Sequence, residues 1–139
     1  MKRNLLLISI LLLTLNACAS GGDAPPDQGL SLHGQYTVNG SDPQGNEYGG
    51  RLIITQTIPG EYHLHWIITD SIQEGTGLLT DNQLTATWRT VAGFSVQQSG
   101  TAKYTLTSAG ELYGTKTIDG QEGKGTETAY PISLEDAGE

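Results

Sequence analysis

Apolar and polar residues alternate with a period of two along most of the chain. In residues 61–69, the apolar side chains of Tyr62, Leu64 and Trp66 are separated by histidines, and a similar alternation surrounds Trp88. A period of two is typical of a strand with one buried face, whereas a helix would repeat every 3.6 residues. No segment carries a helical stripe of useful length. The pattern predicts an all-β chain.

Clusters of glycine, proline, asparagine and aspartate separate the alternating runs, as at Pro59-Gly60 and Asp119-Gly120. Most connections between the runs are short enough for hairpins, which favours an antiparallel up-and-down meander. Eight such strands commonly close into a β-barrel and so remove their exposed edges. An open β-sandwich is the alternative. The runs and turns predict eight strands, at residues 34–39, 47–57, 61–69, 72–79, 83–90, 101–107, 111–117 and 123–130.

Aromatic side chains recur on the predicted inner face of the sheet. These are Tyr36, Tyr62, Trp66, Trp88 and Tyr104. A small barrel either fills its interior with side chains or holds one small ligand, so these residues are either packed core or the lining of a ligand site. The longest predicted loop, residues 91–100, carries Phe94. An exposed apolar residue in a loop can mark a surface for a protein partner.

The first seventeen residues differ from the rest of the chain. Lys2 and Arg3 precede an apolar run from Leu5 to Leu15, and the small residue Ala17 stands directly before Cys18. The apolar run is shorter than the roughly 20 residues that a membrane-spanning helix needs. A basic start, a short apolar core and a small residue at its end are typical of a secretory signal peptide.

The segment Leu15-Asn16-Ala17-Cys18 resembles a bacterial lipobox, the signature of lipoprotein precursors. The resemblance implies cleavage before Cys18, acylation of that cysteine and a lipid bilayer as its partner. Because Ala19 follows in place of an aspartate, the resemblance also favours the outer membrane of the cell envelope. We therefore expect a signal peptide at residues 1–17, the lipidated cysteine and a flexible tether at 18–30, the barrel domain at 31–134 and an acidic tail at 135–139.

The strands and turns of the domain also resemble a group of small exported bacterial proteins, some of which are labelled fibronectin-binding. The barrel is similar in style to the lipocalin and streptavidin barrels. Both resemblances imply a fold, and we carry no functional residue over from either. The matching segments are Gly34-Gln35-Tyr36, Tyr48-x-Gly50, Tyr62-x-Leu64-x-Trp66, Gly75-Thr76-Gly77-Leu78, Gly110-x-Leu112-x-Gly114-Thr115 and Gly123-x-Gly125-Thr126-Glu127.

Charge excludes one class of partner. The leader holds two of the seven basic residues and none of the fifteen acidic ones, so the remaining 122 residues carry a net charge of −10. Such a chain is repelled by phosphate backbones, which argues against nucleic acid as a partner. The charged residues are scattered along the sequence, and this pattern predicts that they lie on a solvated surface.

The residue types that carry catalysis or bind metals do not form a recognisable set. The chain has no Gly-x-Ser-x-Gly nucleophile elbow, and its only cysteine is Cys18. His63 and His65 would project from one face of a strand, but two ligands do not make a metal site. The spacing does not fix a third ligand, for which His33 or Glu74 would be the candidates. We predict no enzyme, no catalytic residue, no metal and no cofactor.

Two functions remain open. The first is a non-catalytic, membrane-anchored binding module whose barrel exterior and loops contact a protein partner. The second is a carrier that holds a small apolar or aromatic ligand inside the barrel, against Trp66 and Trp88. A cavity beside these two residues would favour the carrier, and a packed core with an apolar patch around Phe94 would favour the interaction module.

Acylation of Cys18 can be tested directly. Expression of the full chain in a bacterium with an alkyne-labelled palmitate is expected to label the protein, and Cys18→Ser is expected to abolish the label because serine lacks the thiol that accepts the lipid. The matched variant Ser20→Ala should keep the label. Labelling of Cys18→Ser at the original level would contradict the prediction.

Overall fold

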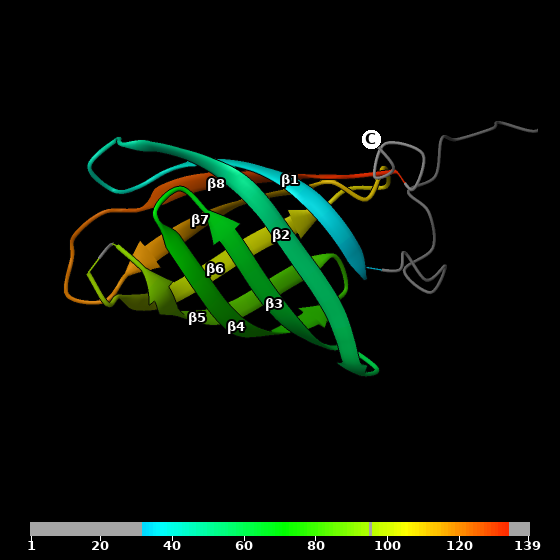
Figure 1. Ribbon diagram of the computed structural model, residues 1–139. Coiled ribbons are helices and arrows are strands. Elements are labelled where there is room, and N and C mark those ends of the chain that lie inside the picture. The colour runs from blue at the N-terminus through cyan, green and yellow to red at the C-terminus, as the bar shows by residue number, and fades with distance from the viewer. Residues whose placement is uncertain (1–31, 95, 134–139) are drawn as a thin grey trace, which may run out of the picture.

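Eight antiparallel strands follow one another around a closed barrel in the order of the chain (Figure 1). The computed structural model describes residues 32–94 and 96–133. Strand β1 pairs with both β2 and β8, which closes the sheet, so the predicted up-and-down barrel is confirmed over the open sandwich. The strands are β1 (Gly34–Ser41), β2 (Glu47–Ile58), β3 (Glu61–Ile68), β4 (Ser71–Thr80), β5 (Gln83–Gly93), β6 (Ser99–Leu106), β7 (Leu112–Ile118) and β8 (Gly125–Pro131).

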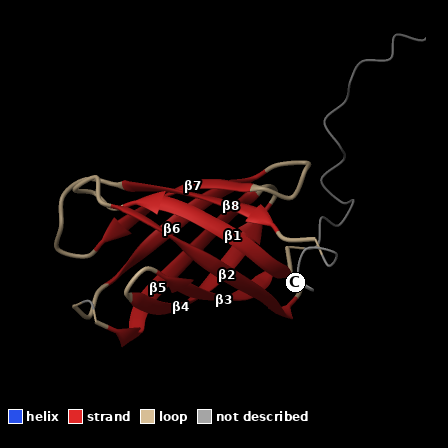
Figure 2. Cartoon of the chain, turned by 45° about the horizontal axis from the view of Figure 1, so that its top comes forward, coloured by secondary structure: helices blue, strands red, loops and turns tan. Residues whose placement is uncertain are grey.

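Strands and short loops make up all of the described chain, as Figure 2 shows. Over residues 32–94 and 96–133, no helix is long and apolar enough to cross a membrane. One predicted loop is wrong. Strand β5 continues to Gly93 and β6 begins at Ser99, so the loop covers residues 94–98 and not 91–100. The register shifts between Ile72 and Gln73 of β4, and this irregularity leaves Val91 as an extra residue in β5 that the alternation did not reveal.

The end of the barrel at which the chain enters is closed by apolar side chains. Leu32 is buried there, and its carbonyl oxygen accepts a hydrogen bond of 2.9 Å from the Tyr36 hydroxyl. The chain also leaves at this end, where the Ile132 amide donates to the carbonyl of Gln35. The buried apolar residues that fill the barrel are Leu32, Tyr36, Val38, Leu52, Ile54, Tyr62, Leu64, Trp66, Leu84, Ala86, Trp88, Ala102, Tyr104, Leu106, Leu112 and Ala129.

A glycine of β4 makes room for the two tryptophans. Gly75 lies opposite Trp88 in the β4–β5 register. A side chain at position 75 would collide with the backbone oxygen of Thr87 and would come within 3.1 Å of the Trp66 ring. The indoles of β3 and β5 therefore fill the barrel interior because β4, which lies between them, presents no side chain at this position.

The space at Gly75 predicts a stability effect. We expect Gly75→Ala to lower the free energy of unfolding by about 2 kcal/mol, since the new methyl group overpacks the core against a rigid backbone oxygen. Urea denaturation followed by tryptophan fluorescence measures the change. Gly49→Ala is the matched control, because its new methyl would have only ordinary contacts, the nearest at 3.5 Å from the Val38 oxygen. Equal stability of the two variants would contradict this packing.

Candidate functional site

A single carboxylate lies in the middle of the barrel. Glu127 of β8 is 1% exposed, yet it has four polar partners from four other strands. The indole nitrogen of Trp66 donates to it at 2.9 Å, the hydroxyl of Tyr104 at 2.5 Å and the hydroxyl of Tyr48 at 2.6 Å. The ammonium nitrogen of Lys116 lies 3.4 Å from its second oxygen. Together these partners satisfy a charge that burial alone would make very costly.

The contact between Tyr48 and Glu127 depends on a glycine. Tyr48 belongs to β2 and Glu127 to β8, and β1 lies between these two strands. In both registers the β1 residue that faces them is Gly40. A side chain at position 40 would occupy the space of the Tyr48 ring. Gly40 thus lets the tyrosine cross over β1 and reach the carboxylate.

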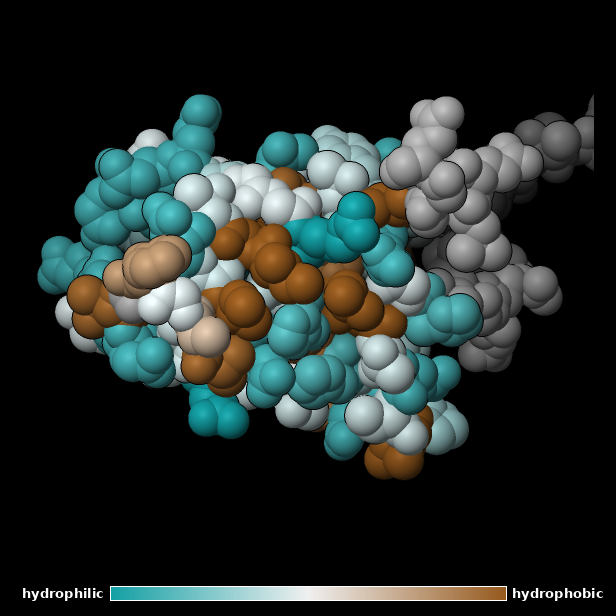
Figure 3. All heavy atoms as spheres, in the orientation of Figure 1, coloured by the Kyte–Doolittle hydropathy of each residue, from teal (hydrophilic) through white to brown (hydrophobic). Residues whose placement is uncertain are grey.

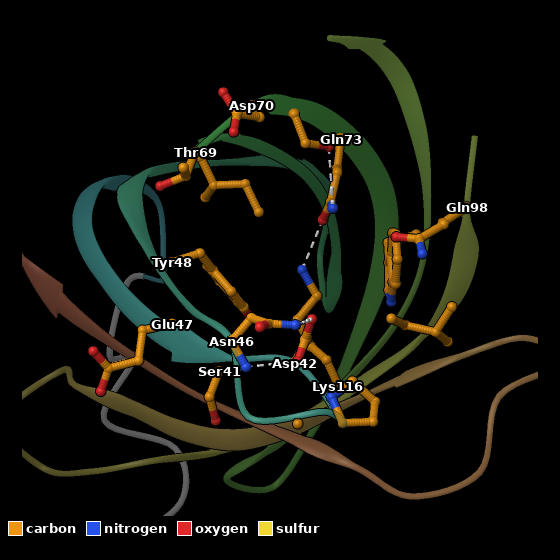
Figure 4. A pocket seen from close by; sticks show the side chains of 16 residues that line it. Ser41, Asp42, Asn46, Glu47, Tyr48, Thr69, Asp70, Gln73, Gln98 and Lys116 are labelled. Carbon is orange, nitrogen blue, oxygen red and sulfur yellow. Dashed lines mark hydrogen bonds between the residues drawn. The ribbon is translucent and has the colours of Figure 1, made fainter. Parts of the chain in front are cut away.

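Lys116 connects this network to the open end of the barrel. Its ammonium nitrogen donates to the side-chain oxygen of Gln73 at 2.7 Å, and the two side chains point toward one another in Figure 4. The amide nitrogen of Gln73 donates in turn to the Ser71 hydroxyl at 3.3 Å. The same ammonium lies 4.6 Å from the ring centroid of Trp66 and 4.7 Å from that of Trp88. These distances place it within the range of cation–π attraction to both indoles.

The surroundings shift the pKa values of the groups in this network. Burial raises the pKa of Tyr104 well above its ordinary value, and the negative charge of Glu127 adds to the effect. The pKa of Tyr48 is raised for the same two reasons. Burial lowers the pKa of Lys116, and the attraction of Glu127 opposes this shift without cancelling it. The tyrosines therefore stay protonated donors, and less free energy than usual is needed to remove a proton from Lys116.

The expectation that all charged residues lie on a solvated surface is wrong for two of them. Lys116 is 5% exposed and Glu127 is 1% exposed. The alternation along β7 already indicated that Lys116 points inward. Lys116 follows Leu112 and Gly114 at intervals of two, and all three belong to the inner face of β7. A single charged side chain is more stable in solvent than in the core. Lys116 and Glu127 can both be buried because each neutralises the charge of the other.

A cavity of about 290 Å³ opens at the end of the barrel opposite the buried Leu32. Figure 4 looks into it and shows Lys116 and Gln73 among the side chains that line it. The side chains of Tyr48, Ile68, Trp88 and Ile118 also line it. The rim comes from the β1–β2 and β3–β4 connections, where acidic residues gather: Asp42, Glu47 and Asp70.

Charge at the cavity disfavours anions. Among the described residues that line it, Lys116 is the only basic one, and its charge is already paired with Glu127. On the rim, the hydrogen bond from the Asn46 side chain lowers the pKa of Asp42, and backbone amides of the same turn add to the shift. Asp42 is therefore ionised at neutral pH. The cavity suits an uncharged or positively charged molecule better than a negatively charged one.

Trp88 offers a free hydrogen-bond donor. Within residues 32–94 and 96–133, its indole nitrogen is the only buried side-chain nitrogen or oxygen without a hydrogen-bond partner. A buried donor left unpaired costs about 1–3 kcal/mol, so such groups usually meet water or a ligand. The ring of Trp88 lines the cavity, whereas its nitrogen lies buried beside Gly100 of β6.

The structure separates the five predicted aromatic residues into three roles. All five are buried inside the barrel. Trp88 lines the cavity, whereas Trp66 and Tyr104 hold Glu127 below it. Tyr36 and Tyr62 belong to the apolar core, and Tyr36 is bonded to Leu32 at the closed end. The alternation of the sequence identified these five residues as inward-facing. It did not identify the other members of the site, which are Lys116, Glu127, Tyr48 and Gln73.

The remaining candidates lie elsewhere. Phe94 is 97% exposed, outside the barrel. Cys18 lies outside the described residues. His65 lies on the outer face, where its ring nitrogen is 3.6 Å from a carboxylate oxygen of Glu74. No group of three or more His, Cys, Asp or Glu side chains that could hold a metal is present in residues 32–94 and 96–133.

Comparison with known proteins supports the fold. The EF1p2_mFAP2b protein bound to DFHBI superposes with a TM-score of 0.58 at 15% identity, over 73% of this chain and 94% of that one. A redesigned β-barrel gives 0.59 at 15% identity, over 73% and 92%. A fluorescence-activating β-barrel designed de novo gives 0.56 at 10% identity, over 72% and 93%. No protein-family model and no curated protein matches the chain, so its resemblance to exported proteins labelled fibronectin-binding stays a prediction.

The pairing of Glu127 with Lys116 predicts non-additive stability. Glu127→Gln alone is expected to lower the free energy of unfolding by about 3 kcal/mol, because Lys116 would keep a buried charge without its counter-ion. Lys116→Met alone leaves the carboxylate unpaired and should cost a similar amount. The double variant is expected to cost at least about 1 kcal/mol less than the two single changes together. Additive losses in urea denaturation would show that the two groups do not act as a pair.

Proposed function

We propose that this protein is a lipid-anchored component of the bacterial cell envelope that binds an uncharged small aromatic molecule in the open end of its barrel. The observation that carries the proposal is the cavity of about 290 Å³, which lies against an aromatic and polar floor. Ligand sites typically have volumes of about 300–1,000 Å³, so this one is at the lower limit. It suits a molecule of one to three rings.

The chemistry of the lining specifies the class of ligand. Trp88, Ile68 and Ile118 give an apolar wall, and the indole nitrogen of Trp88 lacks an acceptor. The acidic rim at Asp42 and Asp70 repels anions. A planar, uncharged molecule fits these features, because it would stack or pack on the apolar wall.

The structural neighbours give a parallel for ligand binding. EF1p2_mFAP2b, a protein of similar fold, was solved bound to DFHBI. At 15% identity the likeness concerns the fold alone, so the proposal for this chain rests on its own cavity. The anchoring through Cys18 and the position in the outer membrane rest on the lipobox resemblance, and they form the second half of the proposal.

The exposed loop favours a second candidate, contact with a protein partner. Phe94 is 97% exposed and Val96 is 78% exposed. Next to this loop, Ile67, Ile72 and Ala92 lie side by side in the registers of β3, β4 and β5. Figure 3 shows apolar side chains on the outer face in that view, interspersed with polar ones. The patch competes with the cavity as the functional surface.

Two dyes with the same ring skeleton test the cavity. N-phenyl-1-naphthylamine is uncharged, and 8-anilino-1-naphthalenesulfonate adds one sulfonate. We expect the neutral dye to bind with a dissociation constant of roughly 0.2 mM or tighter, as about −0.3 kcal/mol per non-hydrogen atom implies. The sulfonate should bind at least about tenfold more weakly because of Asp42, Glu47 and Asp70. Dye fluorescence during titration measures both.

Two variants locate the bound dye. Trp88→Ala removes the aromatic wall, and it should weaken binding of the neutral dye because the ring on which the dye packs is lost. Phe94→Ala should leave the dye affinity unchanged if the cavity is the site. Loss of binding in Phe94→Ala with no effect of Trp88→Ala would move the site to the loop and contradict the proposal.

A further inference from the structure

Lys116 combines a buried amine with access from the cavity. It is 5% exposed, it lines the open end of the barrel, and its amine lies between the indoles of Trp66 and Trp88. The other lysines of the described chain, Lys103 and Lys124, are on the surface. A lysine that serves only to neutralise Glu127 would not need to line a cavity. Its position brings a nucleophilic nitrogen to the inner end of the cavity, where a bound ligand would contact it.

We infer that the amine of Lys116 captures small aromatic aldehydes or ketones from the cavity as a reversible imine, with Glu127 as the proton carrier and counter-ion. This inference rests on the proposed function, because the carbonyl compound must enter the same cavity. It assigns the ligand a reactive group that the non-covalent proposal does not require.

Each step of the capture has a group to perform it. The Lys116 ammonium first gives one proton to the Glu127 carboxylate, whose oxygen lies 3.4 Å away. The amine then attacks the carbonyl carbon, a C–N bond forms, and one N–H proton moves to the former carbonyl oxygen. Glu127 returns its proton to this hydroxyl, which leaves as water while the C=N bond forms. Ammonium and carbonyl compound thus give a protonated imine and one water, with no net change in charge and no oxidant.

The surroundings favour the product as well as the nucleophile. Burial lowers the pKa of Lys116, which increases the fraction of neutral amine. The protonated imine carries the same charge as the ammonium it replaces, so Glu127 remains its counter-ion. The two indole rings, at 4.6 and 4.7 Å from the nitrogen, would lie against a flat, delocalised cation. The side-chain oxygen of Gln73, now 2.7 Å from the nitrogen, could accept its remaining proton.

Reductive trapping tests the inference. The purified protein is incubated at neutral pH with 2-naphthaldehyde and cyanoborohydride, which converts an imine into a stable secondary amine. Mass spectrometry of peptides then compares the rate of labelling at Lys116 with the rates at Lys103 and Lys124 of the same molecules. We expect Lys116 to react at least about tenfold faster, because burial lowers its pKa and so increases the fraction of neutral amine. N-phenyl-1-naphthylamine should protect Lys116 and leave Lys103 and Lys124 unaffected.

Variants keep the result interpretable. Lys116→Arg retains a positive charge for Glu127 but cannot form an imine, so it should lose the fast label. If Lys116→Arg does not fold, the double variant Lys116→Met with Glu127→Gln removes the nucleophile and the unpaired charge together. A fast label that survives at another lysine in these variants would overturn the inference.

A carbonyl-free analogue separates this inference from the proposed function. Naphthalene-2-methanol has the same rings and cannot form an imine. If it displaces N-phenyl-1-naphthylamine while Lys116 is labelled no faster than Lys103, the cavity binds aromatic molecules and imine capture is wrong. If neither the alcohol nor the aldehyde competes with the dye and the dye itself does not bind, both proposals fail.

Discussion

The need to satisfy one buried carboxylate organises the interior of this barrel. Glu127 receives donors from β2, β3 and β6 and a cation from β7, so five of the eight strands meet at one group. Polar networks in a medium of low dielectric specify a structure strongly, because every member that loses its partner carries a large penalty. A change of register in any of these strands would break the network, which ties the pairing of the strands to the chemistry of the core.

The network also divides the interior into two regions with different properties. On the side of Leu32, apolar side chains such as Leu84 and Leu112 pack against one another, and the Tyr36 hydroxyl is satisfied by the Leu32 carbonyl. On the other side, Lys116 and Gln73 turn their polar atoms toward a cavity. Packing of the first region supplies hydrophobic stabilisation, and this allows the second region to keep an unfilled space and an unpaired donor on Trp88.

Strand number, topology and the inward phase of the aromatic residues could be predicted because they depend on alternation and turn residues that are local in sequence. The site could not be predicted in the same way. Lys116 and Glu127 are eleven positions apart on adjacent strands, and their pairing depends on the register between β7 and β8, which alternation does not determine. The path of Tyr48 across Gly40 likewise depends on three strands at once. The bulge that places Val91 outside the regular pairing of β4 and β5 could not be predicted from the alternation either.

The direction of the chain through the barrel has a geometric consequence. Leu32 and Ile132 both lie at the closed end, whereas β1 delivers Ser41 and Asp42 to the rim of the cavity at the other (Figure 1). The two ends of the described chain and the mouth of the cavity therefore lie at opposite ends of the barrel. A tag, a surface or a membrane joined to either end of the domain would hold it at the closed end and leave the mouth of the cavity unobstructed.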